Sequence, residues 1–220
     1  MLIVASLWFL AMLIAVCPLP AKWGMGLNLD ARVATWAYWH NADRDDWANE
    51  IMKVPGVVAF TIAVALALWT WHPLRWRAAG HLALSGLLGG IIYALSKWSV
   101  GRTRPVVIIA PFGFQPFKKG WAGLWGAAEN MSFPSGHTTL AFATAACLAI
   151  NLPRWKWLFY AIAAITAAER VGENAHYLSD VIAGAGVGTV SAYIVHWIEQ
   201  ALAARARQRE ATPQPSAAVA

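Results

Sequence analysis

The segment from Glu169 to Asp180 holds three side chains that suit phosphate chemistry. Arg170 offers a planar guanidinium fork that can bind two phosphate oxygens at once. His176 and Asp180 share one face if a helix begins near His176. A carboxylate that accepts a hydrogen bond from one imidazole nitrogen fixes the tautomer and leaves the other nitrogen as a nucleophile. On these residues alone, a helix-capping Asp180 beside an interfacial histidine is an equally good interpretation.

A second cluster of cations begins at Lys97. Arg102 and Arg104 follow it closely, and Pro105 fixes the chain direction just after Arg104. Arg104 can bind phosphate oxygens bidentately, whereas Lys97 would act as a point charge. Taken alone, Lys97 is also typical of a cation that extends from a membrane span toward the interface.

The tetrapeptide Pro134-Ser-Gly-His137 precedes an apolar stretch and predicts the start of a helix. Proline ends any preceding helix, and Ser135 is a good N-cap. Gly136 allows a ligand to approach the backbone closely. Free N–H groups at such a helix start form an anion site, beside which His137 could donate a proton to a leaving oxygen. Alone, the tetrapeptide is a weak signal, because serine-glycine caps are common.

In chain order, the clusters read Lys97-x6-Arg104-Pro105, Pro134-Ser-Gly-His137 and Arg170-x5-His176-x3-Asp180. This pattern resembles the three-part signature of the type 2 phosphatidic acid phosphatase superfamily, which includes integral membrane lipid phosphatases and soluble vanadium haloperoxidases. One position departs from the pattern: the family usually has serine where Glu169 stands. That carboxylate could pair with Arg170 or another cation, or face away.

The resemblance implies a role for each matched residue. His176 would attack phosphorus and form a phosphohistidine, and Asp180 would orient and polarise the imidazole. His137 would protonate the departing group and then help to activate the water that hydrolyses the intermediate. The cations would stabilise the equatorial oxygens, so that neither a metal nor a cofactor is required. The residues expected to hold the phosphate are Lys97, Arg104, Ser135, Gly136 and Arg170.

Composition indicates that helices in a lipid bilayer position these clusters. Of the 220 residues, 59% are hydrophobic and only 13% are charged, whereas soluble domains carry about a quarter charged residues. A spanning helix needs roughly 20 apolar residues. We therefore predict an all-α polytopic membrane protein with six transmembrane helices, which the soluble haloperoxidases do not match. The predicted spans are Leu2–Cys17, Val54–Trp71, Gly80–Ser96, His137–Leu152, Trp155–Ala168 and Leu178–Trp197.

The first long loop between spans is expected to contain an amphipathic helix. Leu29, Val33 and Trp36 recur at helical spacing, with Asp30 toward the other side. Such a helix would lie in the membrane interface, with Trp36 at the depth of the headgroups.

The chain is predicted to form one membrane domain over residues 1–207, followed by a short disordered tail over residues 208–220. The first apolar window lacks a positive n-region and a good cleavage site, so we interpret it as a retained helix rather than a signal peptide. The remaining histidines stand near predicted span ends or on the amphipathic segment, and no catalytic role is expected for them. They are His40, His72, His81 and His196.

The net charge of +6 does not indicate a nucleic-acid partner, because the basic residues are scattered at helix ends. Anionic lipid headgroups are the simpler partner, and no obligate protein partner is predicted. Six spans place both termini on one side, together with short loops that contain Arg75, Arg77 and Arg154. The positive-inside rule then makes the tail cytoplasmic and turns the three motifs outward, although a raw count over all loops favours the opposite orientation.

The sequence therefore predicts an integral membrane lipid phosphatase at the outer face of a bacterial inner membrane. Candidate substrates are undecaprenyl diphosphate, phosphatidylglycerol phosphate, phosphatidic acid and lipid A phosphate. Two alternatives stay open. The phosphohistidine could pass its phosphoryl group to another lipid, or the chain could be a lipid-binding or transport relative that has lost catalysis. The intact His137, His176 and Asp180 argue against the second alternative.

Overall fold

The computed structural model describes residues 27–41, 46–71, 73, 75–105, 115–117, 120 and 130–211. Within these ranges the chain is helical, and the pairing of extended chain is limited to an isolated antiparallel bridge between Thr103 and Met131. The helices are α2 (Leu27–Asn41), α3 (Asp46–Lys53), the 3-10 helix η2 (Val54–Gly56), α4 (Val58–Trp71), α5 (Arg75–Val100), α7 (Gly136–Asn151), the 3-10 helix η3 (Pro153–Trp155), α8 (Lys156–Gly172) and α9 (Leu178–Ala211).

All of the predicted spans except the first fall on these helices, and the first, Leu2–Cys17, lies outside the described residues. Within the described part, α5 over residues 76–100 and α9 over residues 178–210 are long and apolar enough to cross a bilayer. Residues 47–56 and 58–71 would form a third span, bent by 55° at the break. The all-helical fold is confirmed, and the number of six spans stays a prediction.

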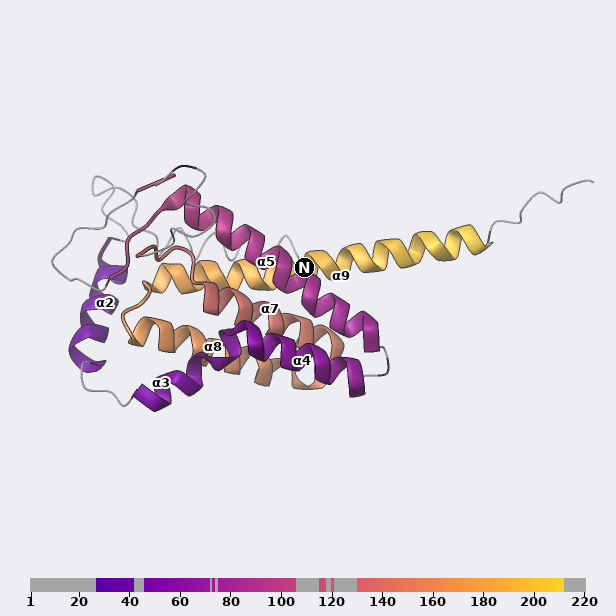
Figure 1. The fold of residues 1–220 in the computed structure, drawn as a ribbon, viewed down its shortest axis with the longest axis horizontal. Coiled ribbons are helices and arrows are strands. Elements are labelled where there is room, and N and C mark those ends of the chain that lie inside the picture. Colours follow the sequence, from indigo (N-terminus) through magenta and orange to yellow (C-terminus); the bar gives the residue numbers. More distant parts are fainter. Residues whose placement is uncertain are drawn as a thin grey trace, which may run out of the picture.

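Helix α7 occupies the centre of the bundle, where it packs against α5, α8 and α9, while α4 packs against α5 (Figure 1). Most of the buried side chains of α7 are small. Small residues allow helix backbones to approach closely, so α7 can pack tightly against its neighbours. Helix α2 lies across one end of the bundle, against α8 and α9, and α9 extends beyond the other end. The buried alanines and threonines of α7 are Thr138, Thr139, Ala141, Ala143, Thr144, Ala145, Ala146 and Ala149.

Helix α9 approaches α7 closely at Gly188. A Cβ atom there would lie 2.1 Å from the Thr139 carbonyl oxygen and 2.7 Å from the Ala143 nitrogen. We expect Gly188→Ala to force α7 and α9 apart and to cost about 1–3 kcal/mol of stability. Thermal unfolding in detergent measures this cost, with Gly80→Ala as control because nothing lies within 4 Å of its added Cβ. Equal unfolding midpoints for the two variants would contradict the expectation.

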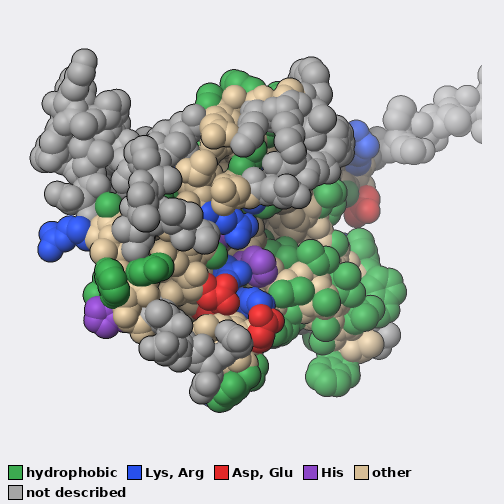
Figure 2. Space-filling view, turned by 60° about the vertical axis from the view of Figure 1, so that its left-hand side comes forward, with side chains coloured by type: hydrophobic (Ala, Val, Ile, Leu, Met, Phe, Trp, Pro, Cys, Tyr) green, Lys and Arg blue, Asp and Glu red, His purple; other side chains and the backbone are tan. Residues whose placement is uncertain are grey.

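Large apolar side chains cover the outer faces of the bundle. Leu66, Leu87 and Leu202 lie on three different helices and are exposed, and hydrophobic side chains form broad patches in Figure 2. Trp71 and Trp157 are exposed at helix ends, where tryptophan favours the membrane–water interface. Exposed apolar surface of this extent is unusual in soluble monomers, and together with the apolar helices it is that of a membrane protein.

Helix α2 forms as predicted, and the burial of its side chains shows which way its two sides point. Asp30 is fully buried, together with Ala34 and Ala37, whereas Leu29 and Trp36 are exposed. The side of the helix that contains Asp30 therefore faces the protein. The reason is that this carboxylate has buried partners on other segments of the chain, which are part of the site described next.

Candidate functional site

A short stretch of backbone pairing joins the first two motifs. Thr103 and Met131 form the antiparallel bridge, and the Ser132 N–H donates to the Arg102 carbonyl oxygen at 2.6 Å. The Ser132 hydroxyl also donates to the Thr103 carbonyl at 3.1 Å. These bonds hold the segment before α7 beside the segment that follows α5.

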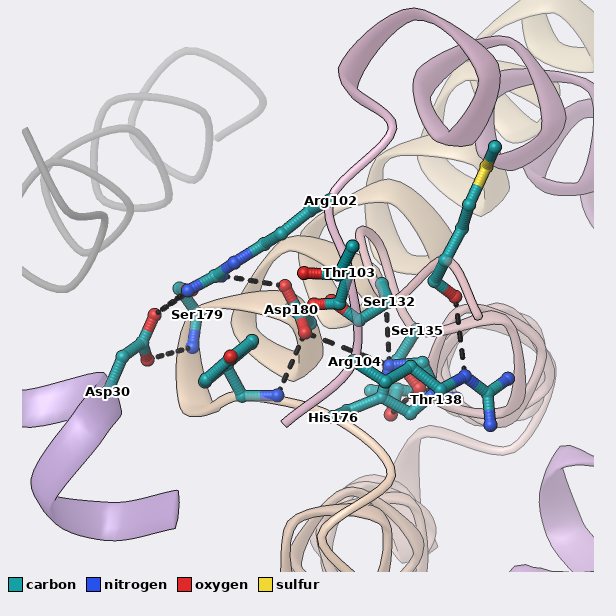
Figure 3. A network of polar contacts seen from close by, with 12 residues as sticks. Asp30, Arg102, Thr103, Arg104, Ser132, Ser135, Thr138, His176, Ser179 and Asp180 are labelled. Carbon is teal, nitrogen blue, oxygen red and sulfur yellow. Dashed lines mark hydrogen bonds and ion pairs between the residues drawn. The ribbon is translucent and has the colours of Figure 1, made fainter. Parts of the chain in front are cut away.

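The same serine orients His176 of the third motif (Figure 3). Nδ1 of the buried His176 lies 2.7 Å from the Ser132 carbonyl oxygen. A carbonyl can only accept, so Nδ1 carries the proton and Nε2 keeps its lone pair. The Asp180 carboxylate is 3.8 Å from Nδ1, which is too far for a hydrogen bond. The hydrogen bond that the sequence assigned to Asp180 is made in this structure to a backbone carbonyl, and Asp180 lies next to the same nitrogen.

Asp180 instead ties the loop of His176 to the start of α9. One carboxylate oxygen accepts the Tyr177 N–H at 2.8 Å, and the other pairs with Arg102 at 2.9 Å. The first contact is the helix-capping interaction that the sequence left open. The negative charge also stays close enough to polarise the imidazole of His176.

A buried network that includes Asp30 and Arg102 supports this loop, and it was not expected from the sequence. The Arg102 guanidinium donates to Asp30 at 2.8 Å, to the Ser179 hydroxyl at 2.6 Å and to Asp180 at 2.9 Å. Its carbon lies 3.8 Å from the centre of the Tyr177 ring. Asp30 accepts the Ser179 N–H at 2.9 Å. Figure 3 shows α2 reaching this end of α9 through that carboxylate.

Five of the eight predicted site residues line one cavity of about 660 Å³. Lys97, Arg104, Gly136, His137 and His176 line its polar part. Figure 2 shows charged and histidine side chains gathered in a hollow beside apolar surface. The cavity continues between α4, α5 and α7 along a wall of small and apolar residues. That wall includes Val58, Gly86, Gly90, Ala94, Leu140 and Ala143.

Two residues predicted to bind phosphate, Ser135 and Gly136, make structural contacts at the start of α7. The Ser135 hydroxyl accepts the Thr138 N–H at 3.4 Å and is buried, so it caps the helix as predicted. It is not among the residues that line the cavity. Gly136 lines the cavity, and a Cβ atom there would lie 3.0 Å from the Tyr93 ring. The hydroxyl of Tyr93 in turn accepts a hydrogen bond from Lys97 Nζ at 2.7 Å.

Arg170, the remaining predicted phosphate ligand, is occupied by carboxylates. Its Nε lies 2.9 Å from Glu169, and its terminal nitrogen also pairs with Glu173. Glu169 is buried, and its carboxylate pairs with Arg170. This pairing is one of the possibilities considered for this unusual position. Arg170 is not among the residues that line the cavity, so a phosphate would have to compete with these carboxylates for it.

The environment of His176 predicts the pH dependence of catalysis. Burial lowers the pKa of His176 below its ordinary value of 6.5, and Asp180 opposes this effect only in part. Because the neutral form carries the nucleophilic lone pair, activity should be retained as the pH falls to 6.5 and be lost only below it. The profile of kcat/KM against pH measures this limb. An acidic limb with its midpoint at pH 7 or above would contradict the assignment, whereas a loss of activity at higher pH would report deprotonation of the proton donor His137.

Comparison with known proteins agrees with the motifs. The PAP2 superfamily profile matches residues 76–203. A lipid A 1-phosphatase of Rhizobium etli is 37% identical over 117 residues, which are 52% of this chain and 47% of that protein. An undecaprenyl-diphosphatase of Sulfolobus acidocaldarius is 26% identical over 162 residues, 69% of this chain and 73% of that protein.

A similar fold is known from a PAP2-type phosphatidylglycerolphosphate phosphatase of Bacillus subtilis, whose crystal structure aligns with a TM-score of 0.61 at 20% identity. The alignment covers 91% of this chain and 96% of that one. The chain spans less than half the length of the lipid A 1-phosphatases that it matches. The family profile nevertheless covers more than half of the chain and includes all three motifs. The chain belongs to the PAP2 superfamily.

Proposed function

We propose that this protein is an integral membrane phosphatase that hydrolyses a lipid phosphate through a phosphohistidine on His176. One observation carries the proposal. His137, His176, Lys97 and Arg104, which come from separate segments of the chain, line one cavity that continues as an apolar groove. The polar part suits a phosphorylated headgroup, and the groove suits the attached hydrocarbon chain.

In the proposed reaction, His176 Nε2 attacks phosphorus and the bond from phosphorus to the leaving oxygen breaks. His137 donates its proton to that oxygen. Lys97, Arg104 and the backbone at Gly136 stabilise the charge on the phosphoryl oxygens, and Arg170 would join them after exchanging its carboxylate partners. Water, deprotonated by His137, then attacks the phosphohistidine. Inorganic phosphate leaves, and both histidines return to their starting states. Ser135 and Asp180 hold the elements that present these groups.

Lipid A 1-phosphate is the first candidate substrate, because lipid A 1-phosphatases are prominent among the similar sequences. Undecaprenyl diphosphate, phosphatidylglycerol phosphate and phosphatidic acid are the other candidates, and relatives named for all three were also found. All four present a phosphate at the bilayer surface with the hydrocarbon in lipid. The cavity accommodates this arrangement in general and does not by itself select one headgroup.

We place the protein in a bacterial inner membrane, as a single domain over residues 1–207 with six spans. Helices α4, α5, α7, α8 and α9 would form five spans, and residues 2–17 the sixth. Helices α7 and α8 have 16 and 17 residues, which is near the short limit for a span. The motif end of the bundle would face outward, and the basic end of α9 would face the cytoplasm.

Phosphate release by the detergent-purified protein tests the proposal. The protein is incubated with each of the four candidate lipids, labelled in the phosphate, in the presence of EDTA. The label is then measured in water-soluble phosphate and in other lipids. We expect inorganic phosphate, most rapidly from lipid A 1-phosphate. Label that moves to a second lipid would instead identify a phosphotransferase. A folded protein that releases and transfers nothing would favour a binding or transport relative.

A further inference from the structure

A second group of polar side chains lies on α5 and α9, away from the cavity of the catalytic histidines. His81 is on α5, and His196 and Glu199 are on α9. One nitrogen of each histidine and one carboxylate oxygen all lie within 4.8 Å of one another. His196 and Glu199 share one face of α9, because they are one helical turn apart. No pattern in the sequence connects them with His81.

This group lies toward the opposite end of the bundle from the motifs. Helix α5 runs from His81 toward Lys97, and α9 runs from Asp180 toward His196. Each of these separations corresponds to about 24 Å along a helix axis. The two sites are therefore separate.

The hydrogen bonds of His81 already prepare one nitrogen for a ligand. His81 is buried, and its Nε2 lies 2.9 Å from the Ala192 carbonyl oxygen, so Nε2 carries the proton. Nδ1 then has a lone pair, which accepts a long hydrogen bond from the Asn151 amide at 3.4 Å, and a metal ion bound there would replace that donor. Histidines that bind metals usually donate their other N–H to a carbonyl or carboxylate in this way.

We propose that His81, His196 and Glu199 bind one divalent transition-metal ion, with Zn²⁺ as the preferred ion. Two imidazole nitrogens and one carboxylate oxygen are a ligand set that Zn²⁺ accepts, with water in the fourth position. The His81 and His196 rings stack with centres 5.7 Å apart, and Glu199 makes no hydrogen bond or ion pair within the described residues. A cation would neutralise that carboxylate and link α5 to α9. The ion takes no part in phosphoryl transfer.

Measuring bound zinc tests the site directly. The full-length protein, freed of any affinity tag, is equilibrated with Zn²⁺ and dialysed, and its metal content is measured by mass spectrometry. We expect about one ion per chain in the wild type and almost none in His196→Gln and Glu199→Gln. His40→Gln is the matched control, because His40 is exposed and, within the described part of the chain, its side chain hydrogen-bonds only to the Trp36 carbonyl of its own helix. Unchanged zinc content in His196→Gln would overturn the proposal.

Two further readouts separate this site from the catalytic histidines and from misfolding. A variant with His137 and His176 both replaced by asparagine should still bind one ion, and loss of the ion there would assign the zinc to the catalytic cavity and overturn the proposal. Zn²⁺ should also raise the unfolding midpoint of the wild type by about 2–4 °C or more. The same addition of Zn²⁺ should leave the unfolding midpoint of His196→Gln unchanged, while that variant stays folded and active in phosphate release. An equal rise of the midpoint in His196→Gln would contradict the site.

Discussion

Replacing His176 with alanine will reduce phosphate release from a lipid substrate by about 10³-fold or more. His176 supplies the atom that attacks phosphorus in the proposed mechanism, and the Ser132 carbonyl orients its imidazole so that Nε2 keeps the lone pair. Loss of the nucleophile removes the covalent route entirely. Steady-state phosphate release at saturating lipid, with EDTA present, measures the effect.

Two comparisons make this result specific. His40→Ala removes an exposed histidine outside the cavity and should leave the rate within about twofold. His137→Ala removes a proton donor rather than the nucleophile, so a loss of about 10²–10⁴-fold is expected. The unfolding midpoint of each variant shows whether the fold is intact. A folded His176→Ala protein that keeps more than a tenth of the activity would mean that another group attacks phosphorus.

Replacing Asp30 with asparagine will destabilise the protein by about 3–5 kcal/mol. The side chains of Asp30 and Arg102 are 0% and 1% exposed, so the substitution leaves a buried guanidinium with one carboxylate fewer. Breaking such a pair costs far more than losing one on the surface. At about 2–4 °C for each kcal/mol, the unfolding midpoint in detergent should fall by roughly 6–20 °C.

Glu50 provides the matched control for this substitution. It pairs with Lys53 on the surface of α3, with 63% of its side chain exposed. Glu50→Gln should therefore cost only about 0–1 kcal/mol, which corresponds to less than about 4 °C. Equal midpoints for Asp30→Asn and Glu50→Gln would show that the buried network does not stabilise the fold.

Many of the helices could be predicted because the length and composition of an apolar segment can be read from that segment alone. The windows on α4, α5, α7, α8 and α9 needed only the composition of each segment. Helix α2 marks the limit of that approach. Its periodicity predicted a helix, yet the direction of Asp30 depends on Arg102, which is distant in sequence. A periodic pattern shows which residues share a face, and a partner elsewhere in the chain decides where that face points.

The site divides in the same way. Lys97, Arg104, His137 and His176 could be brought together because their motifs stand at the ends of apolar windows. The group that orients His176 is the Ser132 carbonyl. Every residue has a backbone carbonyl, so the sequence cannot show which of them accepts this hydrogen bond. The pairing of Glu169 with Arg170 was one of several possibilities until the geometry of α8 was known. His81 and His196 likewise meet only through the packing of α5 against α9.

The most direct test of the central claim is to trap the phosphoryl intermediate. The protein is mixed with a lipid substrate labelled in its phosphate, quenched in alkali within milliseconds and digested, and the labelled peptide is identified by mass spectrometry. We predict an alkali-stable, acid-labile phosphoryl group on His176, present in the wild type and missing from His176→Ala. An active wild type that carries the label on another residue, or carries none while phosphate is released, would contradict the mechanism.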